Sequence, residues 1–150
     1  MKALLKKATL TENRISPLIL RLTMAVVLWP HGAQLFLGLF GGSGYTGSMG
    51  YFMQQGLPYI FAFIVIFLLF FGAIFLLLGL GTRIFAFGIL VIFIGMVTEV
   101  HYSFGFFMNW FGNQKGEGFE YHLLIIGIAI SLMITGGGKL SLDRIFNKEK

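Results

Sequence analysis

Residues 58–80 read PYIFAFIVIFLLFFGAIFLLLGL, and this stretch decides the fold class of the chain. It contains no charged side chain, and it is long enough to cross roughly 30 Å of hydrocarbon, since a helix needs about 20 apolar residues to do so. Pro58 opens the stretch, where its missing amide hydrogen costs no helical hydrogen bond, and Gly79 suits a helix C-terminus. The stretch therefore predicts a membrane-spanning helix.

The uncharged sequence continues outward from this stretch in both directions, from Leu22 to Thr82. Of the 150 residues, 57% are hydrophobic and 11% are charged, whereas soluble domains carry about 25% charged residues. A soluble domain of this length has no core large enough to bury so much apolar sequence. The composition excludes a water-soluble globular protein. It predicts an all-α membrane protein, because the apolar runs lack the alternation of a transmembrane barrel.

Four segments are expected to cross the membrane and to pack as one bundle. They cover residues 17–40, 58–80, 82–104 and 119–138. The connections at 41–56 and 105–118 are expected to be loops, the first rich in glycine and the second in aromatic and amide side chains. No shift of composition marks a second domain. Residues 1–150 are therefore predicted to form a single domain, with basic cytoplasmic tails at 1–15 and 139–150.

The basic residues predict the orientation of the spans. Lys115 lies on one side of the membrane in this arrangement, and the other basic residues flank the opposite ends of the spans. These are Lys2, Lys6, Lys7, Arg14, Arg21, Arg83, Lys139, Arg144, Lys148 and Lys150. The positive-inside rule then places both termini in the cytoplasm. The same distribution explains the net charge of +5 without nucleic-acid binding. Arg21 is expected to extend its guanidinium to the cytoplasmic surface.

Polar side chains gather near the outer ends of three expected spans. His31 lies about 21 Å along the first span at 1.5 Å per residue, and the fourth span begins close to Glu120 and His122. Ionisable residues inside a membrane are costly, so each one suggests a function. The loop at 109–114 is expected to cover the cluster. The candidate site residues are His31, Gln34, Glu99, His101, Trp110, Asn113, Glu120 and His122.

Three interpretations of this cluster are open. Histidine and glutamate could exchange hydrogen bonds and protons with a quinone, because imidazole titrates near neutral pH. The same side chains could bind a metal ion. However, the spacing of Glu99 with His101, and of Glu120 with His122, turns one member of each pair away on an ideal helix, so we assign no metal ligand. Finally, the groups could simply bind one another and the loop backbone, and so fasten this end of the bundle.

Several motifs resemble the DoxX family of small bacterial inner-membrane proteins. They are Arg21-Leu22, Trp29–Gln34, Leu78–Arg83, Asn109–Gln114, Gly116–His122 and Lys139–Arg144. The resemblance runs from about Ser16 to Ile145 and implies a multi-pass, four-helix protein of the bacterial inner membrane. It also implies a redox role, because the family is named after a subunit associated with a terminal quinol oxidase and a thiosulfate:quinone oxidoreductase. Many family members carry a glutamate in the second helix, shortly before a Gly-Gly pair. Residues 67–73 of this chain contain no acidic side chain, so the chain either lacks the function of that glutamate or uses Glu99 instead.

These observations predict a membrane redox subunit that binds quinone or quinol at the outer cluster and works with a partner oxidoreductase. The chain has no cysteine, so a redox role would need a bound cofactor or the partner. The alternative is a non-catalytic membrane scaffold that docks soluble redox or oxidative-stress enzymes. Ion passage ranks last, because the inner halves of the spans offer no polar path. Contact with membrane lipid is expected, and the apolar flanks leave room for a homo-oligomer.

Overall fold

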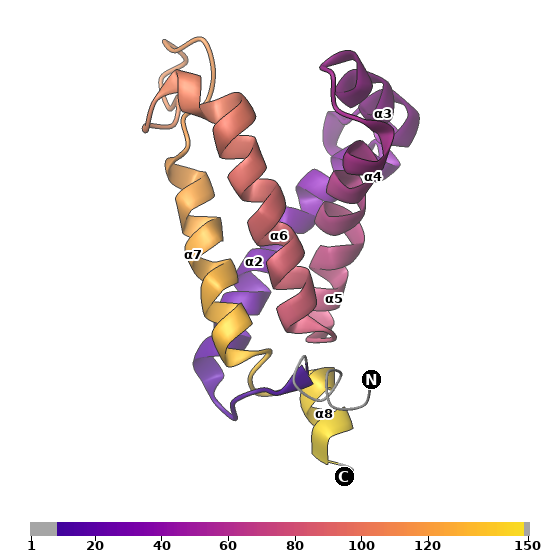
Figure 1. Cartoon of the computed structure of the whole chain (residues 1–150), viewed down its shortest axis with the longest axis vertical. Helices are drawn as coiled ribbons and strands as arrows, with labels where there is room; N and C mark the ends of the chain where they lie inside the picture. The colour runs from indigo at the N-terminus through magenta and orange to yellow at the C-terminus, as the bar shows by residue number, and fades with distance from the viewer. Residues whose placement is uncertain (1–8, 149–150) are drawn as a thin grey trace.

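A computed structural model of the chain describes residues 9–148 (Figure 1). These residues form helices and connecting segments without strands, which confirms the predicted all-helical fold. The α-helices are α2 (Ile15–Leu37), α3 (Gly44–Gln54), α4 (Tyr59–Phe67), α5 (Ala73–Leu78), α6 (Thr82–Met96), α7 (Glu120–Thr135) and α8 (Leu142–Lys148). Two π-helical turns, η2 (Leu68–Gly72) and η3 (Val97–His101), and two 3₁₀ turns, η1 (Leu39–Gly41) and η4 (Tyr102–Phe104), join them.

Three helical segments are long and apolar enough to cross a membrane, judged by length and composition. They are Ile15–Leu37, Tyr59–Leu78 and Thr82–Phe104, and they lie close to the first three predicted spans. The predicted span at 119–138 contains α7, which has only 16 residues. It is shorter than expected because Gly136 leaves the helix with a φ of 76°. The count of four spans therefore stays a prediction.

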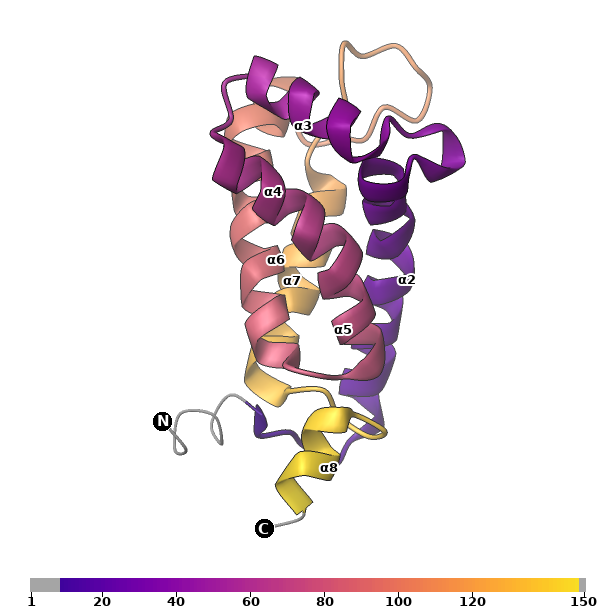
Figure 2. The ribbon, with the colours of Figure 1, turned by 90° about the vertical axis from the view of Figure 1, so that its right-hand side faces the viewer.

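α2, η2, α5, α6 and α7 pack around the main apolar core, and Figure 2 shows how these helices are arranged. α6 lies alongside α7, and α2 packs against α5 and η2. Buried members of the core include Met24, Leu28, Leu69, Leu76, Ile89, Phe93, Ile125 and Leu132. α2 lies close to η2 at Gly32, where a Cβ atom would overlap the main chain of Leu69 and Phe70. Gly32 therefore sets the spacing of these helices beside His31.

The glycine-rich segment at 41–56 is not the loop that its composition predicts. It contains the helix α3, which lies across one end of the bundle (Figures 1 and 2). Met49 packs with Ala62 and Ile66 of α4 in a second, smaller apolar cluster. This packing explains the difference, because tertiary contacts can outweigh the low helix propensity of glycine. The other predicted loop, at 105–118, is free of helix and strand, as expected.

Arg21 does not reach the molecular surface, contrary to the expectation from its sequence. Its side chain is buried, with 1% exposed. Nε donates to the carbonyl of Gly137 at 2.8 Å. The terminal nitrogens donate to the carbonyls of Leu76 at 3.1 Å, Leu77, Lys139 at 3.3 Å and Leu140 at 2.9 Å. These carbonyls end α5 and form the turn before α8, so the guanidinium ties α2 to both and needs no water.

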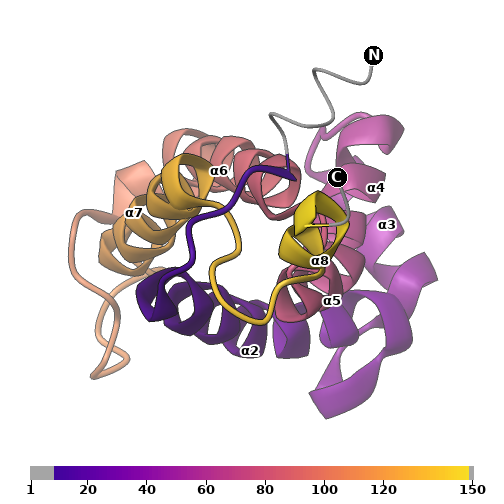
Figure 3. The same cartoon turned by 90° about the horizontal axis from the view of Figure 1, so that it is seen from below.

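Asp143 completes this end of the molecule, which we call the Arg21 end. Its Oδ1 accepts from the amide of Gly81 at 2.7 Å, and its Oδ2 accepts from the amide of Thr82 at 2.9 Å. A carboxylate is favourable there, because the first amides of a helix lack partners and carry partial positive charge. The amide of Asp143 in turn donates to the carbonyl of Gly79 at 2.9 Å. α8 is therefore held against the turn between α5 and α6 (Figure 3).

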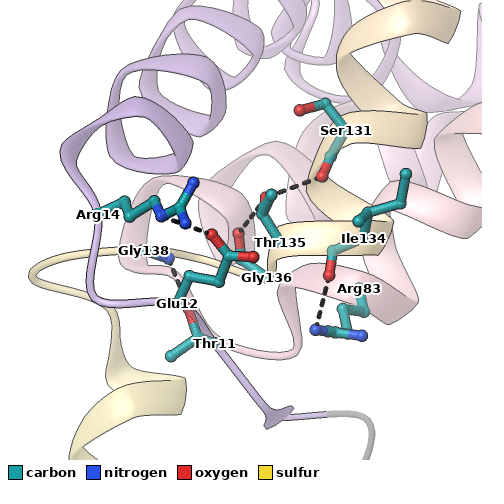
Figure 4. Close-up of polar contacts among 9 residues, drawn as sticks. All are labelled: Thr11, Glu12, Arg14, Arg83, Ser131, Ile134, Thr135, Gly136 and Gly138. Atoms are coloured by element: carbon teal, nitrogen blue, oxygen red, sulfur yellow. Dashed lines mark hydrogen bonds and ion pairs between the residues drawn. The ribbon is translucent and has the colours of Figure 1, made fainter.

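The segment before α2 binds the end of α7 at the same end (Figure 4). The amide of Glu12 donates to the carbonyl of Thr135 at 2.9 Å. Arg83 at the start of α6 donates from Nη2 to the carbonyl of Ile134 at 2.8 Å. A cation is favourable at this position, because the last carbonyls of a helix carry partial negative charge. The Arg21 end is therefore a network of side chains that bind main-chain groups at helix ends.

Candidate functional site

The opposite end of the bundle, which we call the histidine end, contains a cavity of about 310 Å³. It lies between α2, α6 and α7, where the loop at 105–118 begins and ends. Its apolar wall includes Leu28, Phe93 and Met96. Its polar lining consists of His31, Gln34, His101, Glu117, Tyr121 and His122. A mostly apolar cavity with a few convergent polar groups is typical of a small-molecule site.

Two imidazoles meet in this cavity. The ring centroids of His101 and His122 are 4.0 Å apart, with 39° between the ring planes. His122 lies in the first turn of α7, is 5% exposed and packs 5.5 Å from the ring of Phe93. Its Nδ1 is buried and has no hydrogen-bond partner among the described residues. Because an unpaired buried polar atom costs about 1–3 kcal/mol, such an atom suggests a position that a ligand or water fills.

The π-helical turn η3 positions His101. A π turn is wider than an α-helical turn and often occurs at functional positions. It brings His101 to His122, while Glu99 remains exposed, with its carboxylate 3.5 Å from the hydroxyl of Thr98. Glu99 is thus not part of the cavity lining, although the turn is π-helical and not the ideal α-helix on which the spacing argument was based. His101 Nδ1 lies 2.8 Å from the carbonyl oxygen of Glu117. Since a carbonyl oxygen only accepts, Nδ1 carries the hydrogen of this bond.

Two glutamates hold the loop at 105–118. Glu120 Oε1 accepts from the amide of Met108 at 2.9 Å and from Trp110 Nε1 at 3.2 Å. Glu117 Oε2 accepts from the amide of Asn109 at 2.7 Å. These contacts of Glu120 and Trp110 are the kind expected if the polar groups bind one another and the loop backbone. Both glutamates therefore stabilise the loop, and Glu117 also lines the cavity with the histidines.

The predicted site residues thus separate into two groups. His31, Gln34, His101 and His122 line the cavity together, and Gln34 also donates to the carbonyl of Phe40 at 3.2 Å. The others, Glu99, Trp110, Asn113 and Glu120, are not part of its lining. Within residues 9–148, no group of three His, Asp or Glu side chains could hold a metal ion.

Glu117 is a cavity residue that the sequence analysis missed. It contributes its carbonyl to His101 and its carboxylate to the loop. The sequence signal for Glu117 is its position between Gly116 and Gly118, three residues before Glu120. Acidic residues in a loop are usually solvated, so this pattern alone predicts no contact with the cavity.

Residues 16–102 match the DoxX family model. The chain belongs to the DoxX family. It is 29% identical over 136 residues to a protein of Bacillus subtilis (strain 168) named "Putative oxidoreductase CatD", and the match covers 91% of this chain and 90% of that relative. No solved structure gives a significant match to the chain. This DoxX protein is thus a helical membrane protein with a relative that is named as an oxidoreductase.

The motifs of this DoxX protein divide between the two ends of the bundle. Arg21-Leu22, Leu78–Arg83 and Lys139–Arg144 meet at the Arg21 end, where Arg21 and Asp143 bind helix termini. Trp29–Gln34, Asn109–Gln114 and Gly116–His122 meet at the histidine end. The first group is explained by stability alone. The second group supplies His31, Gln34, Glu117, Tyr121 and His122 to the cavity lining, and these side chains together with His101 form the candidate site.

Proposed function

We propose that this DoxX protein is a membrane redox subunit that binds a quinone or quinol in the cavity at the histidine end and works with a partner oxidoreductase. One observation carries the proposal: His101 and His122 are in contact inside a largely apolar cavity, and the buried His122 Nδ1 has no hydrogen-bond partner within residues 9–148. An imidazole can bond to a quinone oxygen and exchange a proton with it near neutral pH. Phe93 and Met96 offer apolar surfaces for the ring.

The size and chemistry of the cavity fit a single ring system. Its volume of about 310 Å³ lies at the lower end of the range for ligand sites, roughly 300–1,000 Å³. A quinone head group is therefore the expected occupant, and its apolar tail would extend into the surrounding lipid. The chain has no cysteine, so the electrons of the quinol would pass to a redox centre of the partner.

We also propose that the chain crosses the bacterial inner membrane four times. Asn147 Nδ2 donates to the carbonyl of Thr9 at 2.6 Å, so the two ends of the described chain lie on one side. This proximity supports an even number of crossings, and α7 is the helix available for the fourth. At 1.5 Å per residue α7 is about 24 Å long, a shortfall that local thinning of the bilayer accommodates. The basic residues at the Arg21 end favour a cytoplasmic position for both termini.

The quinone content of the purified protein tests the proposed ligand. Wild type in a gentle detergent is compared with the double variant His101→Ala, His122→Ala and with Trp29→Leu. Trp29 lines a separate, apolar cavity and serves as the control for non-specific retention of lipophilic molecules. We expect more quinone per mole of protein than in the co-purified lipid for wild type and Trp29→Leu, and the lipid level for the double variant. A wild-type ratio equal to that of the lipid would overturn the proposal.

The exposed aromatic side chains of the loop favour a second candidate function. Phe107, Trp110 and Phe111 are 67%, 79% and 91% exposed. Large exposed aromatics are typical of protein-binding surfaces, so the loop could dock a soluble redox or oxidative-stress enzyme. A photo-crosslinker placed at position 111 in living cells tests this scaffold role. A stable protein adduct would support it, and adducts with lipid alone would exclude docking through the loop.

A further inference from the structure

Glu117 connects the loop to the cavity through two different atoms. Its carboxylate Oε2 accepts from the amide of Asn109 at 2.7 Å, and its main-chain carbonyl accepts from His101 Nδ1 at 2.8 Å. We propose that Glu117 is a positioning residue that makes His101 a hydrogen-bond acceptor toward the cavity, so that the cavity prefers a ligand hydroxyl to a ligand carbonyl. The identity of the ligand as a quinone or quinol rests on the proposed function. The positioning of His101 does not.

His101 carries its ring hydrogen on Nδ1. A carbonyl oxygen offers lone pairs and no hydrogen, so its bond to His101 requires the hydrogen on Nδ1. In the neutral ring, the other nitrogen, Nε2, then carries a free lone pair. His101 lines the cavity, and the bond to Glu117 is its one hydrogen bond among the described residues. Nε2 is therefore the nitrogen left for a ligand, and it accepts.

A nitrogen that only accepts favours ligands that donate a hydrogen bond. The hydroxyl groups of a quinol donate hydrogen bonds, whereas the carbonyl oxygens of the oxidised quinone only accept. The other side chains of the polar lining that can contact a ligand each donate or accept, so they adapt to either form: His31, Gln34, Tyr121 and His122. His101 has one fixed role because Glu117 occupies its other nitrogen. The cavity therefore takes the reduced, hydroxyl-bearing form in preference.

The carboxylate of Glu117 stabilises the position of its own main chain. A carboxylate bonded to an amide forms a charge-assisted hydrogen bond, which is stronger than a neutral one. Directly after Glu117, a Cβ atom on Gly118 would overlap the carbonyls of Gly105 and Phe107. The main chain at Glu117 is thus packed against the start of the loop, and the bond to Asn109 holds it there. The amides of Phe119 and Glu120 hold the following residues by bonds to the carbonyls of Gly105 and Phe106. Removal of the carboxylate would therefore loosen the main chain at Glu117 itself, which includes the carbonyl that His101 needs.

Nitrogen-15 NMR of the histidine side chains in lipid nanodiscs tests the positioning role without any ligand. We expect the His101 hydrogen on Nδ1 in wild type and in Glu117→Gln, whose amide oxygen can still accept from Asn109. We expect a mixture of tautomers in Glu117→Ala. The matched control is Glu120→Ala, which loosens the loop at Met108 and Trp110 but does not contact His101, and it should keep the wild-type tautomer. An unchanged tautomer in Glu117→Ala, or the same mixture in Glu120→Ala, would overturn the positioning role.

Two redox-stable probes test the preference for a hydroxyl. 1-Naphthol and 1-methoxynaphthalene share one ring system, and only the first donates a hydrogen bond. After correction for partition into empty nanodiscs, we expect wild type to bind 1-naphthol roughly threefold to tenfold more tightly, the range for one net hydrogen bond. Glu117→Ala should lose this ratio, and Glu117→Gln and Glu120→Ala should keep it.

The outcomes separate this inference from the proposed function. Equal affinity of wild type for both probes would overturn the preference for a hydroxyl. If neither probe binds, the aromatic ligand class and the preference both fail, and the NMR result alone decides the positioning role. If the probes behave as expected but the protein retains no quinone, the positioning role stands and the proposed quinone ligand fails.

Discussion

The Arg21 end and the histidine end of the molecule both bury ionisable side chains, but they satisfy them differently. Arg21 donates to several main-chain carbonyls, and both carboxylate oxygens of Asp143 accept amide hydrogens. Within residues 9–148, the Thr82 hydroxyl and Glu12 Oε2 at this end are buried without a hydrogen bond, and Glu12 Oε2 is paired with Arg14, whereas at the histidine end His122 Nδ1 and the Tyr121 hydroxyl lack partners beside a cavity. Satisfied charged groups stabilise a fold, whereas unsatisfied groups around a cavity indicate a binding site.

The largest effect is expected from Arg21→Met at the Arg21 end. The substitution leaves carbonyls at the end of α5 and before α8 buried without donors, and we expect a loss of about 3 kcal/mol or more in the free energy of unfolding. Denaturant unfolding in detergent micelles measures it. The control is Arg14→Met, since the Arg14 side chain is 74% exposed and its loss should cost less than about 0.5 kcal/mol. Equal losses in the two variants would contradict a specific role of Arg21.

Gly32→Ala should have the next largest effect, and it acts beside the histidine end. The added methyl group overlaps the main chain of Leu69 and Phe70, so α2 and η2 must separate, at a cost of about 1–3 kcal/mol. Gly127→Ala in α7 is the matched control, because no neighbouring atom lies within 4 Å of a Cβ there. Alanine should stabilise that helix by up to about 1 kcal/mol. Thermal unfolding of both variants compares them, and a neutral Gly32→Ala would disprove the close approach.

A smaller effect is expected from Asp143→Ala. This substitution removes the acceptor for the first amides of α6, and loss of such a cap typically costs about 1–2 kcal/mol. Hydrogen exchange measures the effect locally: the amides of Gly81 and Thr82 should lose protection, and those of α7 should not. Asp143→Asn retains one acceptor oxygen and should lie between wild type and Asp143→Ala. Unchanged exchange at Gly81 would show that Asp143 does not cap α6.

The smallest effect on stability is expected from His122→Leu, and this substitution separates the histidine end most clearly from the Arg21 end. The substitution removes a buried nitrogen that has no partner, so the free energy of unfolding should stay within about 1 kcal/mol of wild type or rise. Retention of quinone should nevertheless fall to the level of the lipid. The same unfolding assay and the quinone measurement are made on one preparation. A loss above about 2 kcal/mol would mean that His122 is structural, like Arg21.

Much of the architecture could be predicted from the sequence. The apolar runs predicted the helices that contain α2, α4 with α5, and α6, and the clustering of His31, Gln34, His101 and His122 predicted their common cavity. The helix α3 was missed, because packing of Met49 against α4 outweighs a composition that favours a loop. Glu117 was missed for a related reason, since its role depends on a partner 16 residues away in the chain.

That this is a helical membrane protein follows from the apolar runs of the sequence, because every backbone amide inside hydrocarbon needs a partner within its own segment. The sequence also indicates which polar residues lie at each end, since depth follows from the rise per residue of a helix. Which of these polar groups have hydrogen-bond partners depends on the tertiary structure. The carbonyls that bind Arg21 lie 55 and 119 residues away, at Leu76 and Leu140. Such partners meet through packing of the helices, and no local pattern in the chain records whether a buried side chain has found one.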